Sequence, residues 1–264
     1  MSLDGITQIT PAIWNSHRAE LVALAISGLE QVNTSEQAGE AISLQSAQLA
    51  RYFVNASQKH NADLIHQAMI WTVTEGRHQW KGYSACADLC HCVLDLLGER
   101  DNRLVNRDDK NFDGTIDADE KRAGWIVELN IAKLVQGSKT IGREKNRQVF
   151  VPGTANDRPE IGDIVWIGGP AGGGFDHVFI VHHWENDLLV STDAGQVDEG
   201  GQCVLERKRQ WIIKGTQPWL RATTNSGVPA AGLGERGVNG WISVSALWDC
   251  FTEMGWRIPE DSTS

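Results

Sequence analysis

Three cysteines and one histidine fall within a single short stretch, GYSACADLCHCVLDLLGER, at residues 82–100. Side chains of these types can hold a metal ion, form disulfides or attack a carbonyl group as nucleophiles. Cys86 and Cys90 are four residues apart and would share one face of a helix, whereas His91 and Cys92 would point elsewhere. The spacing therefore separates the cysteines instead of joining them into one site.

Position on the expected helix decides how each cysteine is interpreted. A zinc site would need a second ligand pair of matching spacing, which the two isolated cysteines elsewhere in the chain do not supply. A disulfide within one helical turn has poor geometry, so we interpret Cys90 and Cys92 as packing residues. Cys86 instead begins the helix after Ser84, a residue type that caps helices. The unpaired amides there favour a thiolate and can stabilise an oxyanion, so Cys86 is the candidate nucleophile.

A nucleophile of this kind needs a base, and His177 is the candidate. It follows a glycine-rich segment and begins the expected strand HVFIVHHW, while Asp193 ends the next expected strand after the turn signal ENDL. Antiparallel strands joined by that turn would bring Asp193 alongside His177, where the carboxylate can orient the imidazole. His182 and His183 lie at the far end of the strand. His183 shares the parity of His177, but we interpret both as ordinary strand residues.

A second segment, DKNFDGTIDADE at residues 109–120, matches the calcium loop of an EF-hand. Oxygen ligands, the glycine and the apolar residue fall at the positions that such a loop requires. The predicted ligands are Asp109, Asn111, Asp113, Thr115 through its backbone carbonyl, Asp117 and Glu120. Because the loop lies between Cys86 and His177, we expect calcium to brace this insert against the rest of the protein. A calcium switch and an acidic turn that binds nothing are the alternatives.

The predicted secondary structure changes along the chain from helices to strands. Residues 17–75 have apolar residues at helical spacing, which predicts helices in HRAELVALAISGLEQV, SEQAGEAISLQSAQLARYFVNAS and ADLIHQAMIWTVTEG. From about residue 149, short apolar runs between turn residues predict four strands, in DIVWIG, HVFIVHHW, DLLVSTDA and CVLERKRQWII. Helices followed by strands favour an α+β fold over an alternating parallel one. We divide the chain into an N-terminal helical region at 1–75, a core at 76–225 with the calcium insert at about 100–145, and a C-terminal extension at 226–264.

Charge and hydropathy exclude several classes of function. The 264 residues carry a formal net charge of -10, which argues against a nucleic-acid partner. No apolar stretch reaches the roughly 18 residues that a membrane span requires. The N-terminus has neither a basic region nor an uninterrupted apolar run, so we see no signal peptide and expect a cytoplasmic protein as synthesised, with any export by a non-Sec route.

With these motifs the chain resembles the NlpC/P60 superfamily of papain-like cysteine peptidases, including its CHAP relatives. The nucleophile helix of that family matches residues 86–98, Cys-Ala-Asp-Leu-Cys-His-Cys-Val-Leu-Asp-Leu-Leu-Gly. The family's next landmarks match Ile-Gly-Asp-Ile-Val-Trp at 161–166 and His-Val-Phe-Ile-Val at 177–181. The chain departs from the family pattern next to the nucleophile, where Ala85 stands in place of an aspartate and Ala87-Asp88 in place of Ser-Gly.

The resemblance implies a papain-like core, with N-terminal helices packed on a small antiparallel sheet. It also implies amide hydrolysis through a thioester, with Cys86, His177 and Asp193 as the catalytic residues and peptidoglycan stem peptides or their amide link to the sugar as substrate. A wall-cutting enzyme without a signal peptide would fit an exported antibacterial effector, with a cognate inhibitor protein as partner, or a lysin. The alternatives are a calcium-binding structural or binding protein on an inactive hydrolase-like scaffold, and a cysteine acyltransferase or hydrolase acting on a non-wall substrate.

Overall fold

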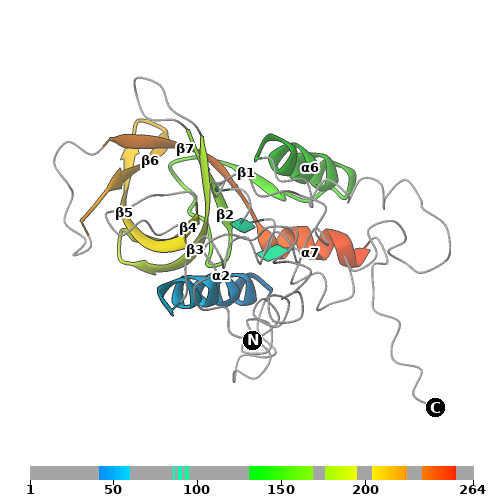
Figure 1. Cartoon of the computed structure of the whole chain (residues 1–264). Helices are drawn as coiled ribbons and strands as arrows, with labels where there is room; N and C mark the ends of the chain where they lie inside the picture. Colours follow the sequence, from blue (N-terminus) through cyan, green and yellow to red (C-terminus); the bar gives the residue numbers. More distant parts are fainter. Residues whose placement is uncertain are drawn as a thin grey trace, which may run out of the picture.

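The computed structural model describes residues 42–59, 131–168, 176–194, 204–224 and 234–253, together with Cys86, Leu89, Cys90, Val93 and Leu94. The helices labelled in Figure 1 are α2 (Ile42–Lys59), α6 (Ile131–Glu144) and α7 (Val244–Glu253). The strands are β1 (Phe150–Pro152), β2 (Ile164–Ile167), β3 (His177–Glu185), β4 (Leu188–Ala194), β5 (Val204–Lys214), β6 (Gln217–Ala222) and β7 (Glu235–Ile242). Helices combined with an antiparallel sheet confirm the α+β class.

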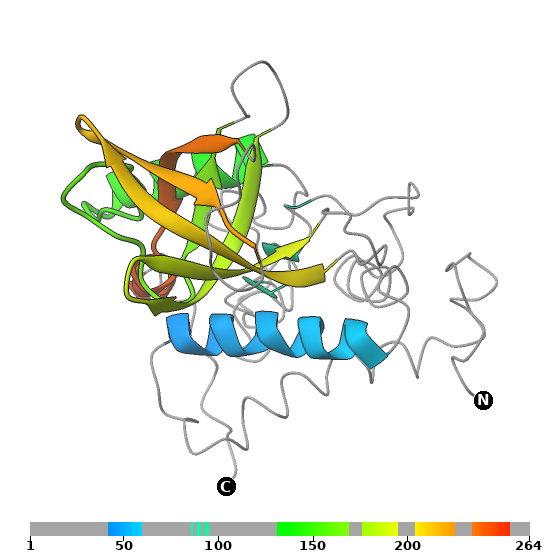
Figure 2. The same cartoon turned by 90° about the vertical axis from the view of Figure 1, so that its left-hand side faces the viewer.

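Six of the described strands close into a barrel, in which each strand runs antiparallel to both of its neighbours (Figures 1 and 2). The order is β7–β2–β3–β4–β5–β6, and β6 pairs back with the first half of β7. β1 pairs with the second half of β7. Because closure pairs the strand edges, the barrel is a rigid frame for the side chains inside it.

Apolar side chains fill the inside of the barrel. They are Val165, Ile167, Phe179, Val181, Leu189, Trp211, Leu220, Val238 and Trp241. The opposite face of β3, at Val178 and Ile180, is also buried, and α2 contacts this strand. A strand that is covered on both sides needs apolar residues at consecutive positions, which explains the unbroken run after His177.

α2 lies across β3, β4 and β5 (Figure 2) and confirms the part of the second predicted helix that the structure describes. Its buried face includes Ala50 and Val54 at helical spacing. The Ser46 hydroxyl donates to the carbonyl oxygen of Gly162 at 3.1 Å. Gly162 has φ +88°, and a Cβ there would lie 1.7 Å from the carbonyl oxygen of Ser43. Glycine is therefore required for α2 to approach the turn before β2 so closely.

Asp163 connects that turn to α7. Its carboxylate accepts the backbone N–H of Glu160 at 2.9 Å and that of Val244, the first residue of α7, at 3.1 Å. Burial raises the pKa of Asp163 to about 7, against the opposing effect of these two hydrogen bonds. α7 also contacts α2 and α6, so Asp163 links the sheet to the helices at one end of the molecule.

The four apolar runs predicted as strands correspond to β2, β3, β4 and β5. Sequence reasoning did not predict β1, β6, β7 or α7. The run ERGVNGWI of β7 contains only three apolar residues and two glycines, so its alternation is weak. β7 nevertheless pairs with β1, β2 and β6, although it falls within residues 226–264, which we set apart as an extension. The division at residue 225 therefore separates hydrogen-bonded strands of one sheet.

The described helices include none that is both long enough and apolar enough to cross a membrane.

Candidate active site

A tight hairpin between β3 and β4 brings the start of one strand close to the end of the other. Asn186 and Asp187 form the turn, and Asn186 has φ +61°, a conformation that asparagine tolerates better than most residues. His177 is the first residue of β3, and Asp193 is the last but one of β4. The turn signal in the sequence thus places these two residues at the same end of the barrel, and the register shift between Val181 and His183 puts them on the same face.

His177 and Asp193 are in direct contact. Nε2 of the imidazole lies 2.6 Å from Oδ2 of Asp193, and both side chains are buried. Because Asp193 engages Nε2, the ring nitrogen that would exchange a proton with a nucleophile is Nδ1. The hairpin therefore produces the contact that we expected, while the roles of the two residues in catalysis stay predictions.

Two further residues bind the Asp193 carboxylate, and sequence reasoning found neither. Arg209 of β5 donates to Oδ1 at 3.1 Å and to Oδ2 at 2.5 Å, and the Ser191 hydroxyl donates to Oδ1 at 2.5 Å. Arg209 shares strand parity with Trp211, which lies in the barrel interior. This alternation could have indicated that Arg209 faces the barrel interior. The charged run ERKRQ, however, is typical of a strand exposed to solvent.

The electrostatics of this group follow from its burial and its charges. Burial alone would raise the pKa of Asp193, but the Arg209 charge and the hydrogen bond from His177 outweigh it and hold that pKa well below its ordinary value. Burial lowers the pKa of His177, and the charges of Arg209 and Arg236 lower it further, against the opposing effect of Asp193. Asp193 is therefore ionised and His177 is neutral at neutral pH, the protonation states of an acceptor and a base.

Cys86 lies on a helix, as expected, and differs in exposure from the next cysteine along it. The Cys86 side chain is partly exposed, whereas Cys90 is fully buried and its thiol points back to the carbonyl oxygen of Cys86 at 3.7 Å. Leu89, Val93 and Leu94 complete the buried face of this helix. Cys90 therefore packs in the interior, as we predicted, while Cys86 is the more accessible thiol of the two.

Arg236 of β7 lies close enough to both Cys86 and the His177–Asp193 pair to interact electrostatically with each of them. Its Nε donates to the carbonyl oxygen of Gly168 at 2.6 Å, and the side chain is half-buried. Burial and the nearby Arg209 charge lower the pKa of Arg236, while Asp176, Cys86 and Asp193 act in the opposite direction.

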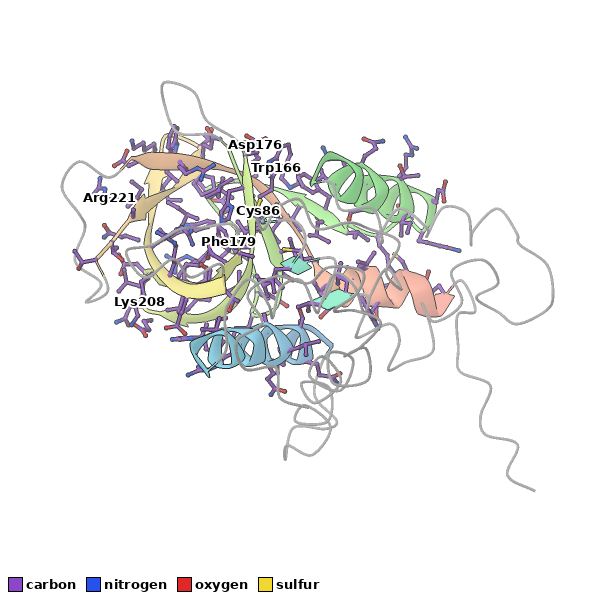
Figure 3. All side chains as sticks on the ribbon, viewed as in Figure 1. Cys86, Trp166, Asp176, Phe179, Lys208 and Arg221 are labelled. Atoms are coloured by element: carbon purple, nitrogen blue, oxygen red, sulfur yellow. The ribbon has the colours of Figure 1, made fainter. Side chains whose placement is uncertain are left out.

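In the view of Figure 3, Cys86 is drawn between the labelled side chains of Trp166 and Phe179, which belong to β2 and β3. The guanidinium of Arg236 interacts electrostatically with the nucleophile candidate Cys86 as well as with His177. A positive charge near a thiol favours its ionised form. Arg236 is a further functional candidate that the sequence did not single out.

The other two histidines of β3 belong to a different environment. The strand register shifts between Val181 and His183, so the inward-facing positions change, and Trp184 packs against the barrel interior. Sequence parity with His177 therefore does not put His183 on the same face. Its Nε2 lies 3.1 Å from Glu185 in a half-exposed position, and His182 contacts Arg51 of α2 at 2.9 Å. Both histidines stay outside the His177 group, consistent with our interpretation of them as ordinary strand residues.

The predicted calcium ligands, at residues 109–120, lie outside the described residues, and so does Cys92. In the part of the chain that is described, no group of three or more His, Cys, Asp or Glu side chains is arranged to hold a metal ion.

No protein-family model matches this chain, and comparison with curated proteins and with solved structures also finds no match.

Proposed function

We propose that this protein is a cysteine hydrolase that cleaves an amide bond with Cys86 as nucleophile, His177 as general base and then acid, and Asp193 as the residue that orients the imidazole. The observation that carries the proposal is the buried 2.6 Å contact between His177 and Asp193, in the same electrostatic environment as a partly exposed thiol on a helix. A neutral imidazole, an ionised carboxylate and an accessible cysteine are the three groups that this chemistry needs.

The reaction follows from the properties of these groups. Cys86 Sγ attacks the carbonyl carbon as its proton passes to His177 Nδ1, and the oxyanion that forms accepts hydrogen bonds from amides at the start of the helix. The C–N bond then breaks, the amine leaves with the proton from His177, and a thioester remains on Cys86. Water, deprotonated by His177, attacks the thioester, releases the acid and returns the thiol.

The proposed framework for this chemistry is a papain-like core, in which a helix carries the nucleophile and antiparallel strands carry the base and its partner. The described arrangement supports it in outline, because Cys86 is helical while His177 and Asp193 belong to neighbouring strands. The proposed substrate, from the resemblance to NlpC/P60 enzymes, is a peptidoglycan stem peptide or its amide link to the sugar.

Digestion of purified peptidoglycan sacculi tests the proposal. The wild-type protein is expected to release soluble fragments whose masses identify the bond cut, and Cys86→Ala is expected to release none. His183→Ala is the matched control, since it removes a histidine of the same strand that lies outside the proposed site. Equal release by wild type and Cys86→Ala would contradict the cysteine mechanism. Fragments from other amide substrates alone would reject the peptidoglycan assignment and keep the mechanism.

The segment 109–120 is proposed to bind one calcium ion that stabilises the insert, on the strength of its match to an EF-hand loop. Addition of EGTA is expected to lower the melting temperature of the wild type, since removal of a ligand that binds only the folded state destabilises that state. Glu120→Gln should have the lower melting temperature from the start and respond less to EGTA. An unchanged melting temperature in EGTA would contradict calcium binding.

A further inference from the structure

The Asp193 carboxylate is shared between His177 and a buried arginine. Oδ2 accepts from His177 Nε2 at 2.6 Å and from one terminal nitrogen of Arg209 at 2.5 Å, while Oδ1 accepts from the other terminal nitrogen at 3.1 Å. Two parallel hydrogen bonds from a guanidinium to a carboxylate fix both the position and the plane of the carboxylate. One carboxylate oxygen therefore serves two partners of different kinds.

The surroundings of Arg209 hold its guanidinium in this orientation. The Ser191 hydroxyl accepts from Arg209 at 2.5 Å and donates to Asp193 at 2.5 Å, so the three residues form a closed ring of hydrogen bonds. On another side the guanidinium lies 4.6 Å from the centre of the Phe179 ring, which is fully buried. Arg209 is itself buried and comes from β5, whereas Asp193 comes from β4 and His177 from β3.

We propose that Arg209 is a positioning residue of the active site, which fixes the Asp193 carboxylate toward His177 and offsets its charge, so that His177 works as a neutral base and not as half of a standing thiolate–imidazolium pair. The inference rests on the proposed function for its catalytic meaning. Its physical basis is that a carboxylate paired with a guanidinium has little net charge left to stabilise an imidazolium.

The other charged groups around His177 agree with this assignment. Arg236 of β7 opposes a positive imidazole, Asp176 is next to His177 in the chain, and Cys86 lies within range of Arg236. The opposing charges of Asp193 and Arg209 are the ones in direct contact. Burial also disfavours the charged imidazole, and the pKa of His177 is lowered from its ordinary value.

Titration of His177 by NMR in the full-length protein tests the proposal, with His177→Gln used to assign the resonance. Removal of the charge in Arg209→Met is expected to raise the titration midpoint of His177 by about one pH unit or more, because Asp193 then acts on the imidazole alone. The rate of Cys86 alkylation by iodoacetamide should reach its plateau at a lower pH in the same variant. Lys208→Met is the matched control, since it removes the cation of another histidine–carboxylate–cation group, formed by residues of β3 and β5, and should change neither profile.

Arg209→Lys separates charge from geometry and covers the case in which Arg209→Met does not fold. Lysine keeps the positive charge but cannot make the two parallel hydrogen bonds. We expect the His177 midpoint to stay near that of the wild type while hydrolysis slows by about 10-fold or more, through loss of orientation. An unshifted His177 midpoint in Arg209→Met, or unchanged hydrolysis in Arg209→Lys, would overturn the proposal.

The failure of this inference and the failure of the proposed function can be told apart. The NMR midpoint does not depend on any substrate. If it shifts in Arg209→Met while no substrate is cleaved by the wild type, the coupling of Arg209 to His177 stands and the hydrolase proposal fails. If the wild type cleaves its substrate through Cys86 and the midpoint does not shift, the hydrolase proposal stands and the inference about Arg209 fails.

Discussion

β3 carries two histidines that each contact a carboxylate and, through it, a cation. At the start of the strand, His177 contacts Asp193 at 2.6 Å, and Asp193 binds Arg209. At the end of the strand, His183 contacts Glu185 at 3.1 Å, and Glu185 binds Lys208 at 2.8 Å. The two groups have the same composition by residue class. They differ in exposure, because the Asp193 side chain is 0% exposed and the Glu185 side chain is 39% exposed.

That difference in exposure determines what each group can do. Water screens the exposed group, so its charges interact weakly and its long side chains can rearrange at little cost. Charges in the buried group cannot be solvated, so each depends on its partner and holds a fixed position. Only the buried group therefore has the fixed charges that the proposed proton transfer by His177 requires.

Replacement of each histidine should separate the two groups most strongly. His177→Ala removes the proposed base and is expected to slow amide cleavage by about 10²–10⁴-fold. His183→Ala removes a half-exposed ring and should leave the rate within about 2-fold, as expected for a surface change away from the site. Initial rates of fragment release measure both. Similar losses in the two variants would mean that β3 does not carry the base at its start.

Replacement of each carboxylate tests how much the two groups contribute to the free energy of unfolding. Asp193→Ala leaves the buried Arg209 without its ionic partner, which should lower the free energy of unfolding by about 3–5 kcal/mol. Glu185→Ala opens an exposed pair and should change it by less than about 1 kcal/mol. Urea denaturation followed by circular dichroism gives both values. A loss below about 1 kcal/mol for Asp193→Ala would show that Arg209 finds solvent or another partner.

Asp163 extends the comparison, because it is a buried carboxylate that accepts hydrogen bonds from two backbone amides, whereas Asp193 binds a cation. Its folded pKa of about 7 lies above the ordinary value of 3.8, so the folded state binds the proton more tightly than the unfolded state. The contribution to stability is present below about pH 4 and is lost as the pH rises through 7, by up to about 1.4 kcal/mol per pH unit.

Asp163→Asn cannot ionise and should lack this dependence. Urea midpoints measured from pH 4 to pH 8 are expected to fall with rising pH in the wild type and to stay flatter in the variant. Parallel curves would show that the two backbone hydrogen bonds keep Asp163 ionised throughout. Asp193, which has Arg209 beside it, should behave in the opposite sense and stay ionised over the whole range.

The smallest effect is expected for Arg236, which acts on Cys86 through its charge. Arg236→Met should slow alkylation of Cys86 at neutral pH by a few-fold, because a nearby cation favours the thiolate. Arg221→Met is the matched control, as that arginine binds Glu235 at the surface between β6 and β7. An equal alkylation rate in wild type and Arg236→Met would mean that only the helix terminus and His177 activate Cys86.

The local elements with strong hydrophobic patterns could be predicted from the amino-acid sequence. Unbroken apolar runs bounded by turn residues predict β2, β3, β4 and β5, and the ENDL turn predicts that Asp193 and His177 lie at the same end of adjacent strands. The register shift between Val181 and His183, which the sequence did not indicate, then puts both residues on one face. Helical position was also enough to separate the buried Cys90 from the more exposed Cys86. These features depend on residues that are close in the sequence, so hydrophobic periodicity and turn residues are enough to predict them.

The distant residues that complete the group around His177 could not be predicted from local patterns, because they come together only in the folded protein. Arg209 and Arg236 come from β5 and β7, and their charges act on His177 because these strands pair with β4 and β2, the two neighbours of β3, an arrangement that no local pattern encodes. β7 itself was missed because its place between β2 and β6 depends on long-range pairing more than on its own weak alternation. The register shift after Val181, which turns His183 away from the face of His177, likewise follows from pairing with β4. Burial then gives the two similar groups of β3 their different electrostatics, because exclusion of water is a property of the assembled barrel and not of any segment.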